Sequence, residues 1–335
     1  MNNGRTKKAA RNITYSMFNQ IVTIVLSFVS RTVFIWGLGP DYLGINGIFS
    51  DVLNLLSMAD LGFNTAMIYS FYKPLAMGDQ KKMAALTTFY KKMYTFIAII
   101  ITVIGIALIP LLPQLINLDR QIPHLTLYYL LSLFGVVSTY LCVYRTSILS
   151  ADQNGFIITR ISMITNMLKT LIMILSIIMF KNYTVYLVIG VVGELLNNII
   201  ASMIASKKYP FIKEKAQLSK EEEKSIFQNM GSVFLYKVSS VLLNATDNVL
   251  ISTIISTTMV GLYSNYLMLQ TKITSLFTLF FSSTTASIAN LIVTEGEDKR
   301  YEIFDCEQVI SFSFCGVIVP CYILLANDFI RIWLG

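Results

Sequence analysis

The sequence predicts an all-α, polytopic membrane protein with about nine transmembrane helices, and three observations support this fold class. Hydrophobic residues make up 55% of the 335 residues and charged residues only 13%, whereas roughly a quarter of a typical soluble chain is charged. The charges are bunched, and the apolar runs between them reach the ~20 residues that a helix needs to cross the ~30 Å hydrocarbon layer. These runs are apolar on all sides, unlike the alternating ~10-residue strands of a membrane barrel, so helices are the spanning structure that remains.

The predicted spans follow one another from a basic start that has no small-residue cleavage site. This pattern indicates a retained first helix with a cytoplasmic N-terminus. Several spans exceed the thickness of the bilayer, so those helices are expected to tilt or to project from it. The predicted helices are residues 13–36, 43–72, 93–112, 122–149, 156–180, 183–205, 230–255, 259–293 and 308–326.

The distribution of basic residues predicts the orientation. With the N-terminus inside, the cytoplasmic loops and their flanks carry 19 of the 26 Lys and Arg residues, and the outside loops carry three: Arg120, Lys181 and Arg331. Cytoplasmic loops of membrane proteins collect Lys and Arg. Topology therefore explains the net charge of +7, which gives no reason to expect a nucleic-acid partner.

The chain carries no recognisable catalytic or metal-binding motif. Its single histidine, His124, lies in a predicted outside loop, and its four cysteines lie in or beside spans without metal-ligand spacing. A Gly-rich phosphate loop, a zinc-protease motif and a nucleophile elbow are all missing. The largest polar stretch, residues 207–229, is too short for a catalytic domain. We therefore predict that the protein is not an enzyme and needs no cofactor or metal.

An internal repeat predicts two lobes. Gly44-Ile-Asn-Gly-Ile-Phe49 resembles Gly261-Leu-Tyr-Ser-Asn-Tyr266 at an offset of 217 (from Gly44 to Gly261). An offset of about 216 also maps the first predicted helix onto the seventh and the third onto the ninth, in the same direction, as in transporters built from parallel repeats. The predicted domains are an N-terminal six-helix lobe (1–206), a cytoplasmic linker (207–229) and an incomplete three-helix C-terminal lobe (230–335).

Eight ionisable residues lie within the predicted spans, where a charge costs at least ~2.5–3.5 kcal/mol on insertion scales. Such residues face a cavity or a partner, so they are candidates for a transport pathway. The alternative role, open for every carboxylate among them, is an ion pair that locks two helices together. The set is Arg31, Lys169, Lys237 and Lys272 with Asp51, Asp60, Glu194 and Asp247.

Arg31 and Asp247 occupy equivalent positions of the two repeats. We expect them to approach each other on the outer side of a central cavity, where closing the contact would favour an inward-open state. A charge swap tests this expectation: Arg31→Asp with Asp247→Arg should work better than either single variant.

Several local sequences resemble bacterial oligosaccharide flippases, the Wzx-type polysaccharide-export proteins of the multidrug/oligosaccharidyl-lipid/polysaccharide exporter superfamily. They are ADLGFNTAMIYSFYKPLA at 59–76 with Gly-Asp-Gln-Lys-Lys at 78–82, ATDNVLIS at 245–252, GLYSNY at 261–266 and FIRIWLG at 329–335. Members of this family have twelve or more helices in two lobes around a central cavity. About nine helices are predicted here, which agrees with the incomplete second lobe predicted from the repeat.

The resemblance implies a substrate and a cellular location. A polyprenyl-diphosphate-linked oligosaccharide repeat unit would move from the inner to the outer leaflet of the bacterial cytoplasmic membrane, for assembly of a lipopolysaccharide, capsule or exopolysaccharide. The implied partners are this lipid-linked oligosaccharide, membrane lipids, and polysaccharide polymerase and assembly proteins. Cations in a water-filled cavity lower the free-energy cost of carrying a diphosphate through a low-dielectric layer. Arg can bind the phosphate oxygens with two hydrogen bonds, and Lys can interact with them as a point charge.

On this interpretation the diphosphate would meet Arg31, Lys237, Lys272 and Lys169. Asp60, Glu194, Asp247 and Asp51 would bind a coupling ion or take part in gating, because no nucleotide-binding motif is present. Polar side chains could contact the sugars or, alternatively, bond neighbouring helices to each other: Asn19, Gln20, Asn64, Tyr69, Asn197, Asn244, Asn248, Asn265 and Gln270. Three other functions stay open: a multidrug exporter of the same superfamily, a membrane-bound polysaccharide polymerase and a nonfunctional truncated flippase.

Overall fold

The computed structural model describes residues 3–57, 63–118, 122–214, 216–224, 226, 247–294 and 296–335. Side chains are described from residue 14 onward, except at 213 and 279–294. The chain divides into two compact units, Met1–Gly261 and Leu262–Gly335, and each is considered by itself below. The predicted domain boundary in the linker stays a prediction.

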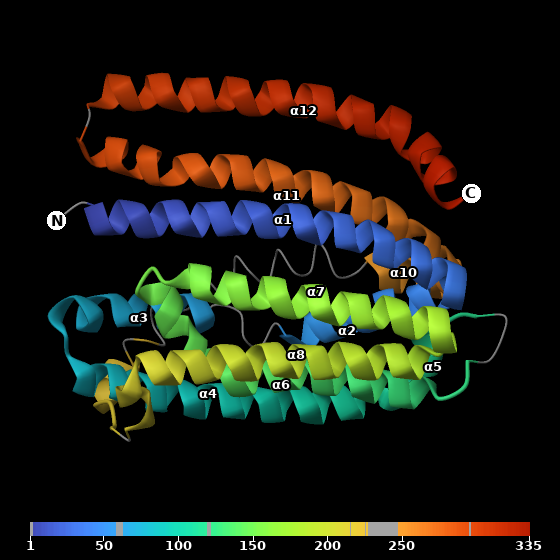
Figure 1. The fold of residues 1–335 in the computed structure, drawn as a ribbon, viewed down its shortest axis with the longest axis horizontal. Coiled ribbons are helices and arrows are strands. Elements are labelled where there is room, and N and C mark those ends of the chain that lie inside the picture. Colours follow the sequence, from blue (N-terminus) through green and yellow to red (C-terminus); the bar gives the residue numbers. More distant parts are fainter. Residues whose placement is uncertain are drawn as a thin grey trace. The chain divides into compact units, whose positions relative to one another are not determined.

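Every regular element in the described residues is an α-helix or a short 3-10 helix, as the composition predicts (Figure 1). Six segments of these residues are long and apolar enough to cross a membrane: Thr14–Leu38, Gln80–Leu115, Leu125–Ala151, Gly155–Phe180, Tyr183–Lys208 and Glu297–Leu334. The elements are α1 (Asn3–Leu38), α2 (Pro40–Leu56), α3 (Phe63–Met77), α4 (Gln80–Ala107), η2 (Ile109–Leu111), α5 (Leu112–Leu115), α6 (Leu125–Ala151), α7 (Gly155–Phe180), α8 (Tyr183–Lys208), η3 (Pro210–Lys213), α10 (Asp247–Ile254), α11 (Thr257–Thr294) and α12 (Glu297–Leu334).

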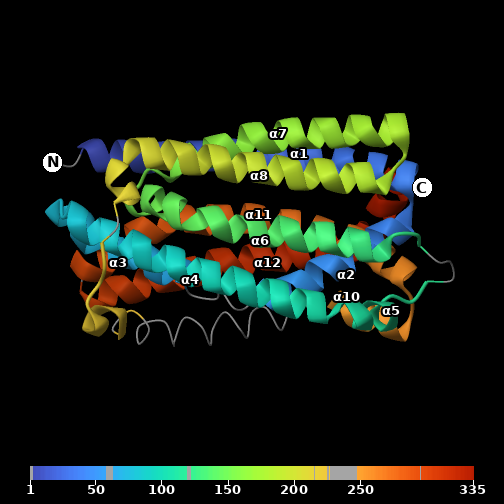
Figure 2. The same ribbon diagram turned by 90° about the horizontal axis from the view of Figure 1, so that it is seen from below.

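The first unit is a bundle in which the long helices run side by side. Contacts join α1 to α7, α7 to α8, α8 to α6 and α6 to α4, while α3 packs on α4 and α6. Figures 1 and 2 show these helices aligned along one direction, with α7 and α8 forming a hairpin. Large apolar side chains stay exposed along α7, among them Leu168, Leu175 and Met179. An apolar face of this kind is what a helix presents to lipid.

The α7–α8 hairpin matches its predicted spans closely, because both ends carry strong stop signals. Lys181 adopts a left-handed conformation with φ of 46° after the last turn of α7. Asn182 then accepts hydrogen bonds from the N–H groups of Thr184 (2.8 Å) and Val185 (3.3 Å) and so caps α8. An apolar run that ends at such a pair is located well by hydropathy alone.

Helix α4 begins at Gln80, well before the predicted start at residue 93, and this corrects the expected boundary. The Asp79 side chain caps it by accepting a hydrogen bond from the Lys82 N–H at 2.9 Å. The polar first turns project beyond the apolar span, where hydropathy gives no signal. Helix α12 likewise begins at Glu297 rather than at 308.

Two other predicted spans are described only in part. The span predicted at 43–72 contains α2 and most of α3, and residues 58–62, including Asp60, lie outside the described residues. The span predicted at 230–255 is described only as α10, so Lys237 also lies outside them.

A cluster of aromatic rings packs one end of the first unit. Phe34 of α1 meets the rings of Tyr183 and Tyr186 of α8, with centroids 6.1 Å and 4.9 Å apart. Tyr183 also contacts Tyr42 of α2 and Tyr128 of α6, each at 4.8 Å. Three of these four pairs are edge-to-face, a geometry that stabilises packing beyond the buried area. The cluster therefore fixes α1, α2, α6 and α8 together at the end predicted to face outward.

The linker forms the short helix that the run from Ser219 to Lys224 predicts. The Ser219 N–H donates to the Glu222 carboxylate at 3.1 Å, and the Glu222 N–H donates to the Ser219 hydroxyl at 3.3 Å. This reciprocal pair is a capping box. Glu222 also forms an ion pair with Lys82 near the start of α4, so the linker is tethered to the first unit.

Acid is expected to release this tether. The hydrogen bond from Lys82, together with that from the Ser219 N–H, lowers the pKa of the Glu222 carboxyl from its ordinary 4.5. A lowered pKa means that the contact is fully present above pH 4.5 and is lost as the pH falls through the lower folded value. The protection of the 219–224 amides from hydrogen exchange, relative to their intrinsic rates, should therefore fall below about pH 4.5 and, in Glu222→Gln, should already be lower at neutral pH. The exposed Glu221→Gln is the control and should exchange like the wild type; equal rates in all three proteins would contradict the tether.

Candidate charged sites in the membrane bundle

Six of the eight predicted intramembrane site residues lie in the described part of the chain. They fall into three places in the first unit and one in the second. Lys272 lies half-buried on α11 in the second unit. The roles predicted for all eight residues stay predictions, and the geometry below shows which of them the fold brings together.

Lys169 of α7 and Glu194 of α8 form an ion pair with an Nζ–Oε2 distance of 3.1 Å. The Lys169 chain reaches Glu194 by lying across Gly193, where an added Cβ would come within 2.6 Å of the Lys169 Cδ and Cγ atoms. The side chains are 19% and 36% exposed. This is the helix-locking arrangement that the sequence left open for the carboxylates.

Glu194 also lines a small polar cavity of about 240 Å³ on the side of α8 that faces α6. Thr139 and Thr146 of α6 and Asn198 of α8 line the same cavity. The Asn198 Nδ2 atom is buried, with no hydrogen-bond partner among the described residues. A carboxylate therefore lies between a lysine on one side and a polar cavity on the other, which is suited to taking up a proton or a small cation.

Arg31 lies half-buried on α1, close enough to Tyr186 of α8 for the two groups to interact electrostatically. Asp247, its expected partner at the equivalent repeat position, begins α10 and lies near Asp51 of α2. The predicted approach of Arg31 to Asp247 stays a prediction.

Asp51 is buried in α2, with 6% of its surface exposed. Asn248 of α10, itself 8% exposed, donates hydrogen bonds to this carboxyl group from its side chain and its backbone. Asp51 Oδ2 and Asn248 Oδ1 have no hydrogen-bond partner among the described atoms. The contact joins α2 to α10, and its two remaining acceptor oxygens are available to a proton or a small cation.

Two more of the amides considered for sugar contacts also bond neighbouring helices. Asn64 of α3 accepts a hydrogen bond from Ser147 of α6 at 3.0 Å. Asn197 of α8 accepts one from Thr165 of α7 at 2.8 Å. With Asn248, these residues take the interhelical role that membrane helices favour.

The two copies of the predicted repeat are in contact with each other where α2 and α11 begin. A Cβ added at Gly44 would lie 2.0 Å from the carbonyl oxygen of Thr257, and one added at Gly261 would lie 2.1 Å from that of Pro40. The offset that maps Gly44 onto Gly261 also maps Pro40 onto Thr257. The contact is therefore reciprocal, as at a two-fold axis.

A third contact at this place joins two equivalent residues directly. The Thr258 hydroxyl donates to the Asp41 carboxylate at 2.7 Å, and these residues are related by the same offset. Equivalent residues touch each other where a two-fold axis passes between them. Three contacts thus join residues that the same sequence offset relates, and this supports the parallel repeat.

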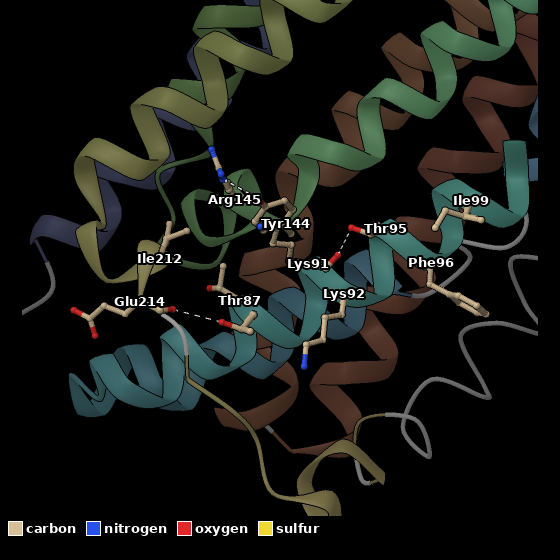
Figure 3. Close-up of a pocket in the computed structure, with 11 residues that line it drawn as sticks. Thr87, Lys91, Lys92, Thr95, Phe96, Ile99, Tyr144, Arg145, Ile212 and Glu214 are labelled. Atoms are coloured by element: carbon tan, nitrogen blue, oxygen red, sulfur yellow. Dashed lines mark hydrogen bonds between the residues drawn. The ribbon is translucent and has the colours of Figure 1, made fainter.

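A larger pocket, which the sequence analysis missed, opens between α4, α6 and η3 and has a volume of about 740 Å³ (Figure 3). Its basic residues are Lys91 and Lys92 of α4 and Arg145 of α6. In the sequence, these cations are predicted only to mark the cytoplasmic side. The available signal was the pairing of Lys91-Lys92 with threonines one turn away on either side, Thr87, Thr88 and Thr95.

Two comparisons with known proteins bear on this chain: one with a protein family and one with a solved structure. The family model described as polysaccharide biosynthesis protein matches residues 9–286. A solved structure described as the inward-facing conformation of a multidrug resistance MATE family transporter of the MOP superfamily is similar, with a TM-score of 0.69 at 16% identity. The match covers 92% of this chain and 72% of that chain, and at this identity it establishes the fold alone. No match was found among the curated proteins.

Proposed function

This chain belongs to the polysaccharide biosynthesis protein family, and from that premise we propose that it is a flippase for polyprenyl-diphosphate-linked oligosaccharide repeat units. It would carry them from the inner to the outer leaflet of the bacterial cytoplasmic membrane. One observation carries the proposal: a chain from a polysaccharide family has the fold of an exporter. A membrane carrier that acts in polysaccharide assembly accounts for both the family and the fold.

The charges within the bundle support an anionic headgroup. Arg31 and Lys169 lie inside candidate membrane-spanning helices, where Lys169 pairs with Glu194 of α8 and Arg31 interacts electrostatically with Tyr186 of α8. A diphosphate that replaced Glu194 as the partner of Lys169 would keep the lysine charge compensated within the membrane, and a diphosphate beside Arg31 would supply the counter-charge that the neutral Tyr186 does not. The prenyl tail needs no binding site in this scheme, since it can stay in the lipid beside the exposed apolar face of α7.

The carboxylates support a coupling role. Glu194, between Lys169 and the cavity lined by Asn198, is the best-placed acceptor for a proton or a cation. Asp51 and Asp247 form a second candidate group, and Asp60 is a further candidate from the sequence. Transport that survives neutralisation of Asp60, Glu194 and Asp247 together would dismiss carboxylate coupling.

Multidrug export is the alternative that the fold neighbour raises, because that protein is described as a multidrug resistance transporter. A site for cationic drugs needs a carboxylate available in the cavity. Glu194 is paired with Lys169, whose positive charge disfavours a bulky organic cation at the same place, so the residues favour an anionic substrate.

Complementation of a bacterium that lacks its own repeat-unit flippase tests the proposal, with surface polysaccharide as the readout. We expect the chain to restore polymer and Arg31→Ala to reduce it about tenfold, as for loss of one charge-assisted contact. Lys181→Ala is the matched control, because Lys181 lies over the Trp36 ring 4.7 Å away, outside the proposed set. Protein that reaches the membrane, restores no polymer and instead lowers the accumulation of cationic dyes would establish drug export.

A further inference from the structure

The pocket between α4, α6 and η3 has a cationic end and an apolar end. Its polar end carries Lys91, Lys92 and Arg145, and its one acidic lining residue is Glu214. Glu214 is exposed, and its carboxylate points away from Lys91 and Arg145 in Figure 3. The polar end therefore has an excess of positive charge that no lining carboxylate neutralises, and it is suited to an anion.

Arg145 is held in position for a ligand. Its Nε donates to the Tyr144 hydroxyl at 2.9 Å, and Nη1 donates to the Ser202 hydroxyl at 3.3 Å. Two of its five N–H donors are used in this way, and the other three have no hydrogen-bond acceptor among the described residues. Fixing a guanidinium in advance reduces the entropy that a ligand must overcome, and its planar donors match phosphate oxygens.

The other end of the pocket is apolar. Phe96 and Ile99 line the pocket one to two turns after Lys92 on α4, and they are 60% and 57% exposed. Seven residues of helix, from Lys92 to Ile99, correspond to roughly 10 Å along the axis. Over this distance α4 passes from its polar first turns into its apolar membrane span. From this change in polarity we expect the pocket to lie where the headgroups meet the hydrocarbon of the bilayer.

We propose that this pocket binds the phosphate-bearing headgroup of a membrane lipid. Lys91, Lys92 and Arg145 contact the phosphate, and the first part of the tail lies against Phe96 and Ile99. A soluble phosphate would use the cations but gain nothing from the exposed apolar wall. The same chemistry is found in anionic phospholipids of the inner leaflet and in prenyl diphosphates, and the proposal does not depend on the function proposed above.

Native mass spectrometry of the purified full chain tests this, with phosphatidylglycerol, phosphatidylcholine and a polyprenyl diphosphate as probes. We expect one anionic lipid to be retained in preference to phosphatidylcholine, and Lys91→Gln/Arg145→Gln to weaken it about tenfold or more. The control Lys81→Gln/Lys207→Gln removes the same charge from exposed positions at the same end, outside the pocket, and should bind like the wild type. If Arg145 proves necessary for folding, Lys91→Gln/Lys92→Gln removes charge without disturbing its hydrogen bonds.

The probes separate the two lipid sources. Prenyl diphosphate that displaces phosphatidylglycerol makes the pocket a docking site for a prenyl-linked substrate, and the reverse preference makes it a phospholipid site; both outcomes support lipid phosphate. Phe96→Asn should weaken either lipid but leave competition by inorganic phosphate unchanged. Equal binding of anionic and zwitterionic lipid, equal loss in the pocket and control variants, or inorganic phosphate that displaces lipid at equal concentration would overturn the proposal.

Discussion

Gly44→Ala is expected to destabilise the folded protein by about 1–3 kcal/mol, as overpacking in a filled interface does. The new Cβ would lie 2.0 Å from the Thr257 carbonyl oxygen, which is a backbone atom that cannot rotate away. The start of α2 and of α11 would have to separate. The midpoint of thermal unfolding in detergent, followed by size-exclusion fluorescence, measures the loss.

Other glycines provide a graded series for this experiment. Gly47→Ala meets a Val260 methyl group at 3.1 Å and should cost less, and Gly135→Ala finds its nearest atom at ordinary contact distance, 3.5 Å. Gly135→Ala should even be slightly stabilising, because alanine favours helix over glycine by roughly 1 kcal/mol. Gly261→Ala should match Gly44→Ala, and the double variant should cost less than the sum, since either change alone already parts the interface. Equal unfolding midpoints for Gly44→Ala and Gly135→Ala would contradict the close approach.

Glu194→Leu is expected to lose up to ~2.5–3.5 kcal/mol, the insertion cost of a lysine near the centre of a membrane helix, because Lys169 would be left without its partner. The double variant Lys169→Leu/Glu194→Leu should regain most of that stability, as when a buried ion pair is replaced by apolar residues. Asn197→Leu is the control on the same helix pair. It breaks the neutral hydrogen bond to Thr165 and should cost only about 0.6 kcal/mol.

The same double variant separates a structural pair from a transport site. If Lys169 and Glu194 only lock α7 to α8, the stable double variant should transport normally. If they contact the headgroup or a coupling ion, it should be stable and inactive, and Lys169→Arg should keep part of the activity. Polymer restored to the wild-type level by the double variant would remove both residues from the proposed mechanism.

Hydropathy predicted the membrane fold, and the predicted spans 156–180 and 183–205 agree with α7 and α8 within a few residues. It failed at the start of α4, since the polar turns after Gln80 lie outside the apolar span. The cap at Asp79 was the local signal that could have corrected the boundary. Hydropathy locates the part of a helix that lies in lipid, and capping residues locate its ends.

The Lys169–Glu194 pair could have been predicted. Lys169 lies twelve residues before Lys181, and Glu194 lies twelve residues after Asn182. An antiparallel hairpin that turns at these two residues brings such positions to the same depth. The pocket at Lys91 and Arg145 could not be predicted in this way, because it depends on how α4 and α6 pack against η3, and their separation in sequence carries no such symmetry.

The reciprocal contact of Gly44 and Gly261 bears on how the two halves of the chain could diverge. Elsewhere each half meets different surroundings, and its side chains can change independently of the other half. At this contact a bulkier residue in one half strikes the backbone of the other, so both copies must stay small. The stretch GINGIF resembles GLYSNY in halves that otherwise share little sequence, so the repeat is clearest in sequence where its two copies are in contact and neither can enlarge alone.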